Sequence, residues 1–166
     1  MQQEETEKEY KKLIQENERL IWKVCSIYAY SSADREDLFQ EIAIRIWKAL
    51  PTFRGQSKVS TWIYRVAINT AITGLRRKKD FIHSMEPASL PDHEIEEDTK
   101  AEQEKLQELY KSIDNLNAIE KAIVMLYLEE RSYVEMEEIL GITQGTLRVK
   151  MNRIKEKLRQ STQKNQ

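Results

Sequence analysis

SYVEMEEILGITQGTLRVKMNRIKEKL, residues 132–158, contains two helical patterns separated by a glycine turn. Ser132 is followed three residues later by Glu135, the spacing of a capping box, in which two side chains satisfy backbone amides that have no helical partner. Gly141 marks the end of this short helix, because glycine readily takes the left-handed conformation that closes a helix. Thr143 can cap the helix that follows. A short helix, a glycine turn and a longer helix together predict a helix-turn-helix.

The second of these helices has two chemically different sides. Its apolar side chains recur at helical spacing and point one way: Leu147, Met151, Ile154 and Leu158. Residues 148–159 also carry six basic residues and one acidic residue. In the major groove arginine forms paired hydrogen bonds with guanine and asparagine with adenine, while other basic groups neutralise phosphates. DNA binding is therefore the first interpretation of this helix, and a solvated amphipathic helix with a basic face is the alternative.

The composition of the chain favours an all-α fold. Only 4 glycines and 3 prolines occur in 166 residues, and residues that favour helices are abundant. The formal net charge of −1 hides a segregation of charge. The basic run at residues 76–79 and the basic C-terminal helix flank residues 86–104, which hold eight acidic residues and one basic residue, Lys100. Two basic patches are thus predicted on either side of an acidic connector.

Apolar stripes at helical spacing divide the chain into two parts. Before the acidic connector, residues 10–28, 38–50 (with Trp47 on the apolar stripe) and 62–71 each predict one amphipathic helix, and the second ends before Pro51. Three such helices can close one small core. Periodicity disappears from residue 80 to about residue 103, as in a flexible linker. Two further helices are predicted beyond it, in residues 106–116 and 119–127, ahead of the helix-turn-helix.

The loop at residues 52–60 and the aromatic residues after it have two interpretations. Core packing is the first expectation for Trp62, because aromatic residues beside a loop usually close a core. Stacking on unpaired bases is the second, because Asn69 and the basic run follow on the same segment. Proteins that bind single-stranded nucleic acid combine aromatic side chains, on which bases stack, with basic side chains that follow the backbone.

Several classes of function are disfavoured. Cys25 lies on an apolar stripe, where a buried structural thiol is expected, and His83 and His93 have no cysteine nearby with which to bind a metal. Without a nucleophile, an acid–base pair or a phosphate loop, the chain is expected not to be an enzyme and to need no cofactor. The N-terminus is polar and no stretch approaches about eighteen apolar residues, which predicts a cytoplasmic protein without membrane insertion.

Two parts of the chain resemble conserved regions of a known family. DLFQEIAIRIWKAL at residues 37–50, Phe53-Arg54-Gly55 and STWIYRVAIN at residues 60–69 resemble region two of the extracytoplasmic-function (ECF) sigma factors of bacterial RNA polymerase. Residues 132–158 resemble region four of the same family. The resemblance implies two small helical domains: region two at residues 1–79 and region four at residues 104–166. A flexible acidic linker at residues 80–103 would join them.

The resemblance also implies a function and its partners. A sigma factor binds the β′ clamp coiled coil and the β flap of core RNA polymerase and directs promoter recognition, melting and initiation. An anti-sigma factor is expected to clamp the two domains together. The residues implied to contact the clamp are Asp37, Gln40, Glu41, Arg45 and Lys48. Those implied to bind the minus-ten element, with a base flipped into the loop, are Phe53, Arg54, Ser57, Lys58, Ser60, Trp62, Asn69, Thr73, Arg76 and Arg77. Those implied to bind the minus-thirty-five element are Thr146, Arg148, Lys150, Asn152 and Arg153.

Two residues depart from the family pattern. Glu137 stands where a helix-turn-helix usually has a small residue, so its carboxylate is expected to reach solvent or a cation. Thr73 replaces an amide one turn after Asn69, which predicts a different minus-ten preference. The alternative function is a regulator that binds DNA alone through the helix-turn-helix and uses its N-terminal helices to sense a ligand or to dimerise. That alternative leaves the match at residues 53–69 unexplained.

Overall fold

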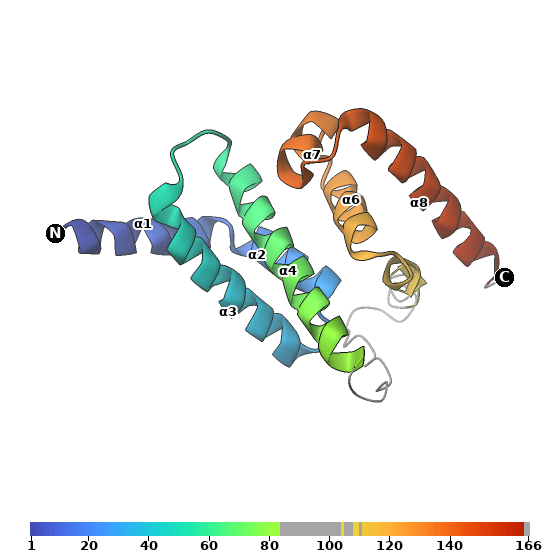
Figure 1. Ribbon diagram of the computed structural model, residues 1–166, viewed down its shortest axis with the longest axis horizontal. Helices are drawn as coiled ribbons and strands as arrows, with labels where there is room; N and C mark the ends of the chain where they lie inside the picture. The colour runs from blue at the N-terminus through green and yellow to red at the C-terminus, as the bar shows by residue number, and fades with distance from the viewer. Residues whose placement is uncertain (84–103, 105–107, 110, 165–166) are drawn as a thin grey trace. The chain divides into compact units, whose positions relative to one another are not determined.

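The computed structural model describes residues 1–83, 104, 108–109 and 111–164, without the side chains of residues 78–83 and 162–164. Within these residues every regular element is a helix, which confirms the predicted all-α class (Figure 1). The chain divides into two compact units, Met1–His93 and Glu94–Gln166. This division falls inside the segment predicted to be the linker.

The core of the first unit lies between α2 (Glu18–Tyr28), α3 (Ser32–Ala49) and α4 (Val59–His83), each of which packs against the other two (Figure 1). Ser31 caps α3 by accepting a hydrogen bond from the Asp34 amide at 3.1 Å. The apolar stripes meet at side chains with almost no exposed surface: Ile21, Val24, Cys25, Ile42, Ile46, Ile63, Ala67, Ile68 and Ala71. Burial of this apolar surface is the main favourable contribution to folding.

The prediction of one continuous helix over residues 10–28 is wrong. The chain forms α1 (Gln2–Glu16) and α2 instead, separated at Asn17, whose backbone has φ −114° and ψ 13°. The Asn17 side-chain amide donates to the Leu13 carbonyl at 2.8 Å, and the Asn17 backbone N–H bonds to the same carbonyl. Asparagine offers such a local alternative to helical hydrogen bonding, and the helix is therefore interrupted at this residue.

α1 buries no residue completely but is attached to α3 through Tyr10. The Tyr10 hydroxyl donates to the Ala43 carbonyl at 2.8 Å, and its ring meets Trp47 edge-on, with centroids 5.0 Å apart. Trp47, predicted on the apolar stripe of α3, packs against α1 rather than in the core and stays 37% exposed.

The connection from α3 to α4 uses the predicted helix breakers. Pro51 lies in a single 3₁₀ turn, η1 (Leu50–Thr52), and Gly55 has φ +71° in the loop that follows. α4 then continues to His83, three residues past the predicted start of the linker at residue 80. The helix can extend this far because the first proline after the basic run is Pro87. Residues 84–103 of the predicted linker lie outside the described residues.

The second unit contains α6 (Ala118–Leu128), α7 (Tyr133–Leu140) and α8 (Gln144–Lys164), and α8 packs on both α6 and α7. Residues 108–109 and 111–114 of the helix predicted ahead of them are also helical. The buried apolar side chains are Ala122, Ile123, Leu126, Met136, Ile139, Leu147, Met151 and Ile154. The predicted helix at residues 119–127 and the helix-turn-helix at residues 132–158 are therefore confirmed.

A complete capping box lies one helix earlier than predicted. At the start of α6 the Asn117 side chain accepts from the Glu120 amide at 2.8 Å, and the Glu120 carboxylate accepts from the Asn117 amide at 3.2 Å. At α7 the predicted Ser132 cap is confirmed, since its hydroxyl oxygen accepts from the Glu135 amide at 3.2 Å. The Glu135 carboxylate lies 3.4 Å from the Arg131 guanidinium. A full capping box would also need the Glu135 carboxylate to accept from the Ser132 amide. Arg131 competes with that amide for the carboxylate, because a charge-assisted hydrogen bond is stronger than a neutral one.

Candidate nucleic-acid interface

The turn between α7 and α8 has the predicted geometry. Gly141 has φ +70°, and its amide donates to the Glu137 carbonyl at 2.8 Å, which closes α7. Thr143 begins α8: its hydroxyl oxygen accepts from the Thr146 amide at 3.4 Å, and the hydroxyl donates to the Thr146 hydroxyl at 2.9 Å. These contacts fix where α8 begins and therefore which side chains it directs outward.

α8 turns one side into the second unit and the opposite side to solvent. Leu147, Met151 and Ile154 are buried, so the positions between them lie on other sides of the helix. Thr146, Arg148, Asn152 and Arg153, all predicted to contact DNA, are exposed, and Lys150 is half-buried. The structure thus brings the predicted α8 set onto the part of the helix that can enter a groove.

A residue of α7 holds Arg148. The guanidinium carbon of Arg148 lies 4.9 Å from the centre of the Tyr133 ring, in a cation–π contact. This contact restricts the side chain while the edge of the planar guanidinium keeps its N–H donors, so less conformational entropy would be lost on forming the predicted paired hydrogen bonds. Sequence reasoning missed Tyr133. The signal that points to it is its place as the first residue of α7, next to the turn into α8.

Glu137, the unusual residue of the helix-turn-helix, is only partly buried. Among the residues with described side chains, no buried side-chain nitrogen or oxygen atom lacks a hydrogen-bond partner. The expectation that this carboxylate avoids unpaired burial is therefore confirmed. Burial of a charge without a partner would be costly.

In the first unit, two aromatic residues at the ends of the loop stack on each other. The Phe53 and Trp62 rings have centroids 4.7 Å apart and planes inclined by 27°. Both side chains are half-buried, so the expectation that Trp62 packs in the core is wrong: it packs on Phe53 at the edge of the unit. Tyr64, which follows it in α4, is 1% exposed. The stacked pair forms an aromatic wall beside the loop.

The loop itself is shaped by local hydrogen bonds. The Gln56 side chain accepts from the Arg54 amide at 3.1 Å, across Gly55, and the Ser57 hydroxyl donates to the Lys58 carbonyl at 3.4 Å. Arg54 and Lys58 are exposed, whereas Ser57 and the predicted contact residue Ser60 are half-buried. The loop beside the aromatic wall therefore carries two exposed cations.

Further predicted strand-contacting residues follow one side of α4. Asn69, Arg76 and Arg77 are exposed and Thr73 is half-buried, at spacings that place them along one stripe. Arg65 is exposed one turn before Asn69 and extends the stripe toward the loop. Arg65 was not among the predicted contact residues, although it lies in the stretch at residues 60–69 that resembles region two, and its spacing of four residues from Asn69 is the signal that points to it.

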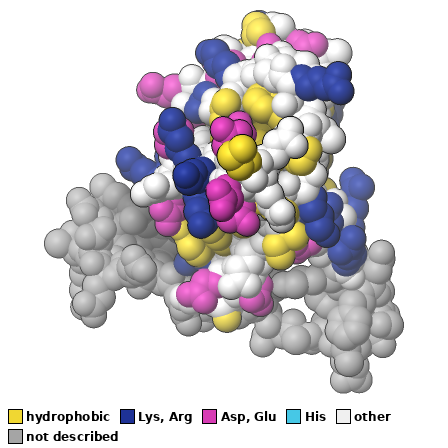
Figure 2. Space-filling view, turned by 90° about the vertical axis from the view of Figure 1, so that its left-hand side faces the viewer, with side chains coloured by type: hydrophobic (Ala, Val, Ile, Leu, Met, Phe, Trp, Pro, Cys, Tyr) yellow, Lys and Arg dark blue, Asp and Glu magenta, His cyan; other side chains and the backbone are white. Residues whose placement is uncertain are grey.

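The residues predicted to contact the polymerase clamp surround an apolar centre on α3. Asp37, Gln40 and Lys48 are exposed, and Glu41 and Arg45 are half-buried. Ile44, which sequence reasoning missed, is 53% exposed and lies one turn from Gln40, Glu41 and Lys48. On the face shown in Figure 2, acidic and basic side chains likewise lie beside apolar ones.

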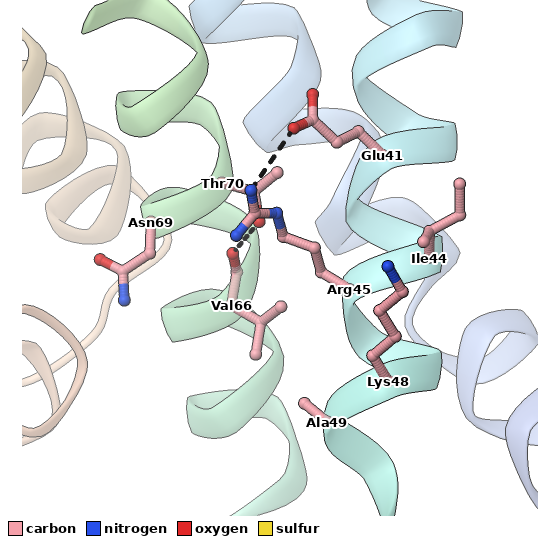
Figure 3. A pocket seen from close by; sticks show the side chains of 8 residues that line it. All are labelled: Glu41, Ile44, Arg45, Lys48, Ala49, Val66, Asn69 and Thr70. Carbon is pink, nitrogen blue, oxygen red and sulfur yellow. Dashed lines mark hydrogen bonds and ion pairs between the residues drawn. The ribbon is translucent and has the colours of Figure 1, made fainter. Parts of the chain in front are cut away.

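A groove of about 630 Å³ between α3 and α4 brings two predicted sets of residues together (Figure 3). Glu41, Arg45 and Lys48, predicted to contact the clamp, line this groove together with Asn69, predicted to contact the promoter strand. Within the groove the Arg45 guanidinium lies 3.7 Å from the Glu41 carboxylate (Figure 3). Its other lining residues are Ile44, Ala49, Val66 and Thr70.

Comparison with known proteins identifies the family. The families Sigma-70 region 2 and Sigma-70, region 4 match residues 13–81 and 106–158. The ECF RNA polymerase sigma factor SigW of Bacillus subtilis is 30% identical over 151 residues, which cover 84% of this chain and 81% of the relative. The chain belongs to the ECF sigma factors. The ECF RNA polymerase sigma-E factor of Escherichia coli is also 30% identical, over 137 residues that cover 75% of this chain and 72% of the relative.

Two solved structures share the fold of this sigma factor. One is the sigma factor RpoE in complex with the anti-sigma factor NepR from Bartonella quintana, with a TM-score of 0.76 and 18% identity over 94% of this chain and 98% of that chain. The other is CnrH in complex with the cytosolic domain of CnrY, with a TM-score of 0.70 and 14% identity over 96% and 91% of the two chains. At these identities the likeness establishes the fold alone.

These findings confirm the resemblance to sigma regions two and four, and the function of an ECF sigma factor is to direct transcription initiation. The ends of the two domains and the roles of single residues stay predictions. The described helices include none that is long and apolar enough to cross a membrane. Among the residues that the structure describes, no group of three or more His, Cys, Asp or Glu residues is placed to hold a metal ion.

Proposed function

We propose that this sigma factor binds core RNA polymerase in the cytoplasm, reads both promoter elements and supports melting by binding alone, without catalytic chemistry of its own. The observation that carries the proposal is that both family matches include exposed residues suited to these contacts, on α3, on α4 with its loop, and on α8.

α8 reads the minus-thirty-five element in the major groove. Arg148, Asn152 and Arg153 are exposed and carry the donors and acceptors that match guanine and adenine edges. Thr146 and Lys150 lie beside them and contact the backbone. The Thr146 hydroxyl already accepts from Thr143, and this contact orders the start of the helix against the DNA.

The loop and α4 hold the melted minus-ten strand. A base flipped from the duplex costs a few kcal/mol in lost stacking, and a pocket must recover that cost. The wall formed by Phe53 and Trp62 supplies an apolar surface, and the exposed cations Arg54 and Lys58 neutralise flanking phosphates. Asn69, Thr73, Arg76 and Arg77 continue the path of the strand along α4.

α3 binds the clamp coiled coil of the β′ subunit. Asp37, Gln40, Glu41, Arg45 and Lys48 form a mixed-charge rim, and the exposed Ile44 provides its apolar centre. An apolar centre with a polar rim is the usual composition of a protein interface. The second unit completes the attachment by binding the β flap.

An anti-sigma factor is a further proposed partner. Both similar structures contain a bound partner: the anti-sigma factor NepR in one and the cytosolic domain of CnrY in the other. We assign this chain the same kind of regulation, in which a partner clamps its two units and withholds them from polymerase.

In vitro transcription with core RNA polymerase tests the proposal. The protein together with core enzyme is expected to start transcripts at defined sites, while the protein alone binds promoter duplex weakly. A regulator that acts by itself through the helix-turn-helix would instead bind duplex tightly without polymerase. No stimulation over core enzyme alone on any template would contradict the sigma proposal.

A matched pair of variants separates promoter melting from duplex binding. Trp62→Ala removes the stacked wall and is expected to lower open-complex formation, measured by permanganate reactivity of unpaired thymines, while binding of the upstream duplex stays unchanged. Trp62→Phe keeps a ring that can stack on Phe53 and is expected to retain melting. If both variants melt the promoter as well as the parent protein, Trp62 has no role in holding the strand.

A further inference from the structure

The outward side of α8 carries an apolar side chain that none of the assigned contacts uses. Val149 is 51% exposed. It lies two residues from buried Leu147 and two residues from buried Met151, which places it on the opposite side of the helix from the core. Among the residues of the second unit that the structure describes, the packing therefore does not account for an apolar residue at this position.

The neighbours of Val149 make up the proposed DNA-reading side. Thr146, Asn152 and Arg153 lie one helical turn from it and are all exposed. Gly145, also one turn away, presents no side chain, and a Cβ added there would meet nothing within 4 Å. The surface beside Val149 is therefore low and open, so that a base edge can approach the isopropyl group closely.

In the major groove, only one kind of chemical group suits an apolar side chain such as Val149. Base edges in that groove present hydrogen-bond donors and acceptors, apart from the 5-methyl group of thymine. Valine can neither donate nor accept a hydrogen bond, and as a β-branched residue it is a weaker helix former than the long polar residues usual on a solvated side. An exposed valine in the centre of a groove-reading surface is explained by contact with a methyl group.

We propose that Val149 selects thymine at one position of the minus-thirty-five element by contacting its 5-methyl group. This inference rests on the proposed function, since it requires α8 to enter the major groove. It adds an apolar specificity contact to the polar contacts assigned to Arg148, Asn152 and Arg153.

Removal of single methyl groups from the DNA tests the proposal. The probe is a duplex whose upstream element has been selected from a randomised library by this protein bound to core polymerase. Each thymine in the element is replaced in turn by deoxyuridine, which lacks only the methyl group, and holoenzyme binding is measured by competition. At one position the substitution is expected to weaken binding about threefold to fivefold, the effect of exposing one methyl-sized apolar group to water.

Two variants assign that effect to Val149. In Val149→Ala, thymine and deoxyuridine are expected to bind equally at the sensitive position. Val134→Ala is the matched control, because Val134 is also a valine, is 54% exposed and lies on α7 rather than α8. It is expected to retain the full preference for thymine.

The outcomes separate this inference from the proposed function. The inference is overturned if the selected element lacks thymine, if no thymine is sensitive to loss of its methyl group, or if Val149→Ala keeps the preference. If the library yields no element because the protein confers no sequence-dependent binding on core polymerase, the proposed function itself fails.

Discussion

Lys157 of α8 donates to both carboxylate oxygens of Glu120 at the start of α6, each at 2.9 Å. The same carboxylate accepts from the Asn117 amide at the capped end of α6. One glutamate thus caps α6 and ties that helix to α8, the helix proposed to read DNA. The Glu120 side chain is 9% exposed and the Lys157 side chain 55%. If the pair is broken, the lysine can be hydrated where it lies, whereas the carboxylate is left as a nearly buried, unpaired charge, which is the main energetic cost.

Glu120→Ala is expected to lower the free energy of unfolding by about 1 to 3 kcal/mol, because a helix cap and a nearly buried ion pair are lost together. Urea denaturation measures the change. Arg159→Ala is the control: Arg159 pairs with Glu156 at 3.8 Å in a solvent-exposed geometry, and its loss is expected to change stability by less than about 0.5 kcal/mol. Equal effects of the two substitutions would remove any special role for Glu120.

Gly141→Ala and Gly145→Ala are expected to have opposite effects on stability. Gly141 has φ +70°, where alanine costs about 1 to 2 kcal/mol, whereas Gly145 lies in the first turn of α8, where alanine stabilises by up to about 1 kcal/mol. A Cβ at either position meets nothing within 4 Å, so backbone conformation alone separates the two substitutions. Thermal unfolding of the two variants provides the comparison, and a shift of the melting temperature in the same direction would contradict it.

Cys25 is expected to resist thiol reagents until the first unit unfolds. The side chain has no exposed surface, and burial raises the pKa of its thiol to about 12. Relative to an ordinary pKa near 9.0, this lowers the reactive thiolate fraction by roughly a thousandfold at neutral pH. Ellman's reagent is expected to react slowly with the native protein and rapidly in urea. Native labelling at the rate of an exposed thiol would show that the site is open.

The raised pKa of Cys25 also predicts how stability changes at high pH. Because the folded state holds the thiol proton more tightly than the unfolded state, the stabilising effect is fully present below pH 9 and is lost as pH rises through about 12. Comparison with Cys25→Ala isolates this contribution: the stability difference between the parent and the variant is expected to shrink between these pH values.

Lys121→Met is expected to stabilise the second unit at neutral pH by about 1 kcal/mol, because Lys121 is 7% exposed and its charge is poorly hydrated. Desolvation lowers the pKa of the amine, and Asp114 at 3.9 Å offsets part of that effect. At pH values between the lowered pKa and 10.5, Lys121 is more protonated in the unfolded state than in the folded state. The free energy of unfolding of the parent protein therefore rises with pH in this range, and burial of Lys121 becomes less costly. The advantage of the variant in denaturation experiments is therefore expected to diminish toward pH 10.5. An advantage that grows with pH would contradict this account.

Arg148→Ala and Arg153→Ala are each expected to weaken binding of holoenzyme to the minus-thirty-five element by about 1 to 3 kcal/mol. Tyr133→Leu removes the ring that holds Arg148 and is expected to cost about 0.5 to 1 kcal/mol, whereas Tyr133→Phe keeps a ring and most of the affinity. A double-mutant cycle tests the link, since Tyr133→Leu should have no further effect once Arg148 is alanine. Additive losses would show that Tyr133 acts independently of Arg148.

The sequence predicts well those structural features that depend on a few adjacent residues. The left-handed Gly141, the Ser132 cap and the end of α3 at Pro51 each depend on a few adjacent residues, and the structure contains all three. The partner of Trp47 was not predictable, because it comes from α1 packing against the outside of α3, a contact that helical periodicity does not encode. The same reason applies to Tyr133, whose importance comes from its distance to a residue of another helix.

The candidate site divides in the same way. On α8, residue chemistry alone suggests DNA contacts, because arginine and asparagine have specific partners in the major groove, and the roles of these residues stay predictions. On α3, the side chains of Asp37, Gln40 and Lys48 have the properties of any solvated helix, and only resemblance to the family assigned them a partner. The groove that joins this surface to Asn69 depends on the packing of α3 against α4 and was not predictable from either segment alone.

The groove between α3 and α4 has a consequence for inhibition. Glu41, Arg45 and Lys48 share it with Asn69, so the proposed docking surface for polymerase and the proposed path of the promoter strand meet in one place. A single polypeptide segment seated there would block both partners at once. An inhibitor that occupies this one groove on the first unit is therefore expected to interfere with two successive steps of initiation.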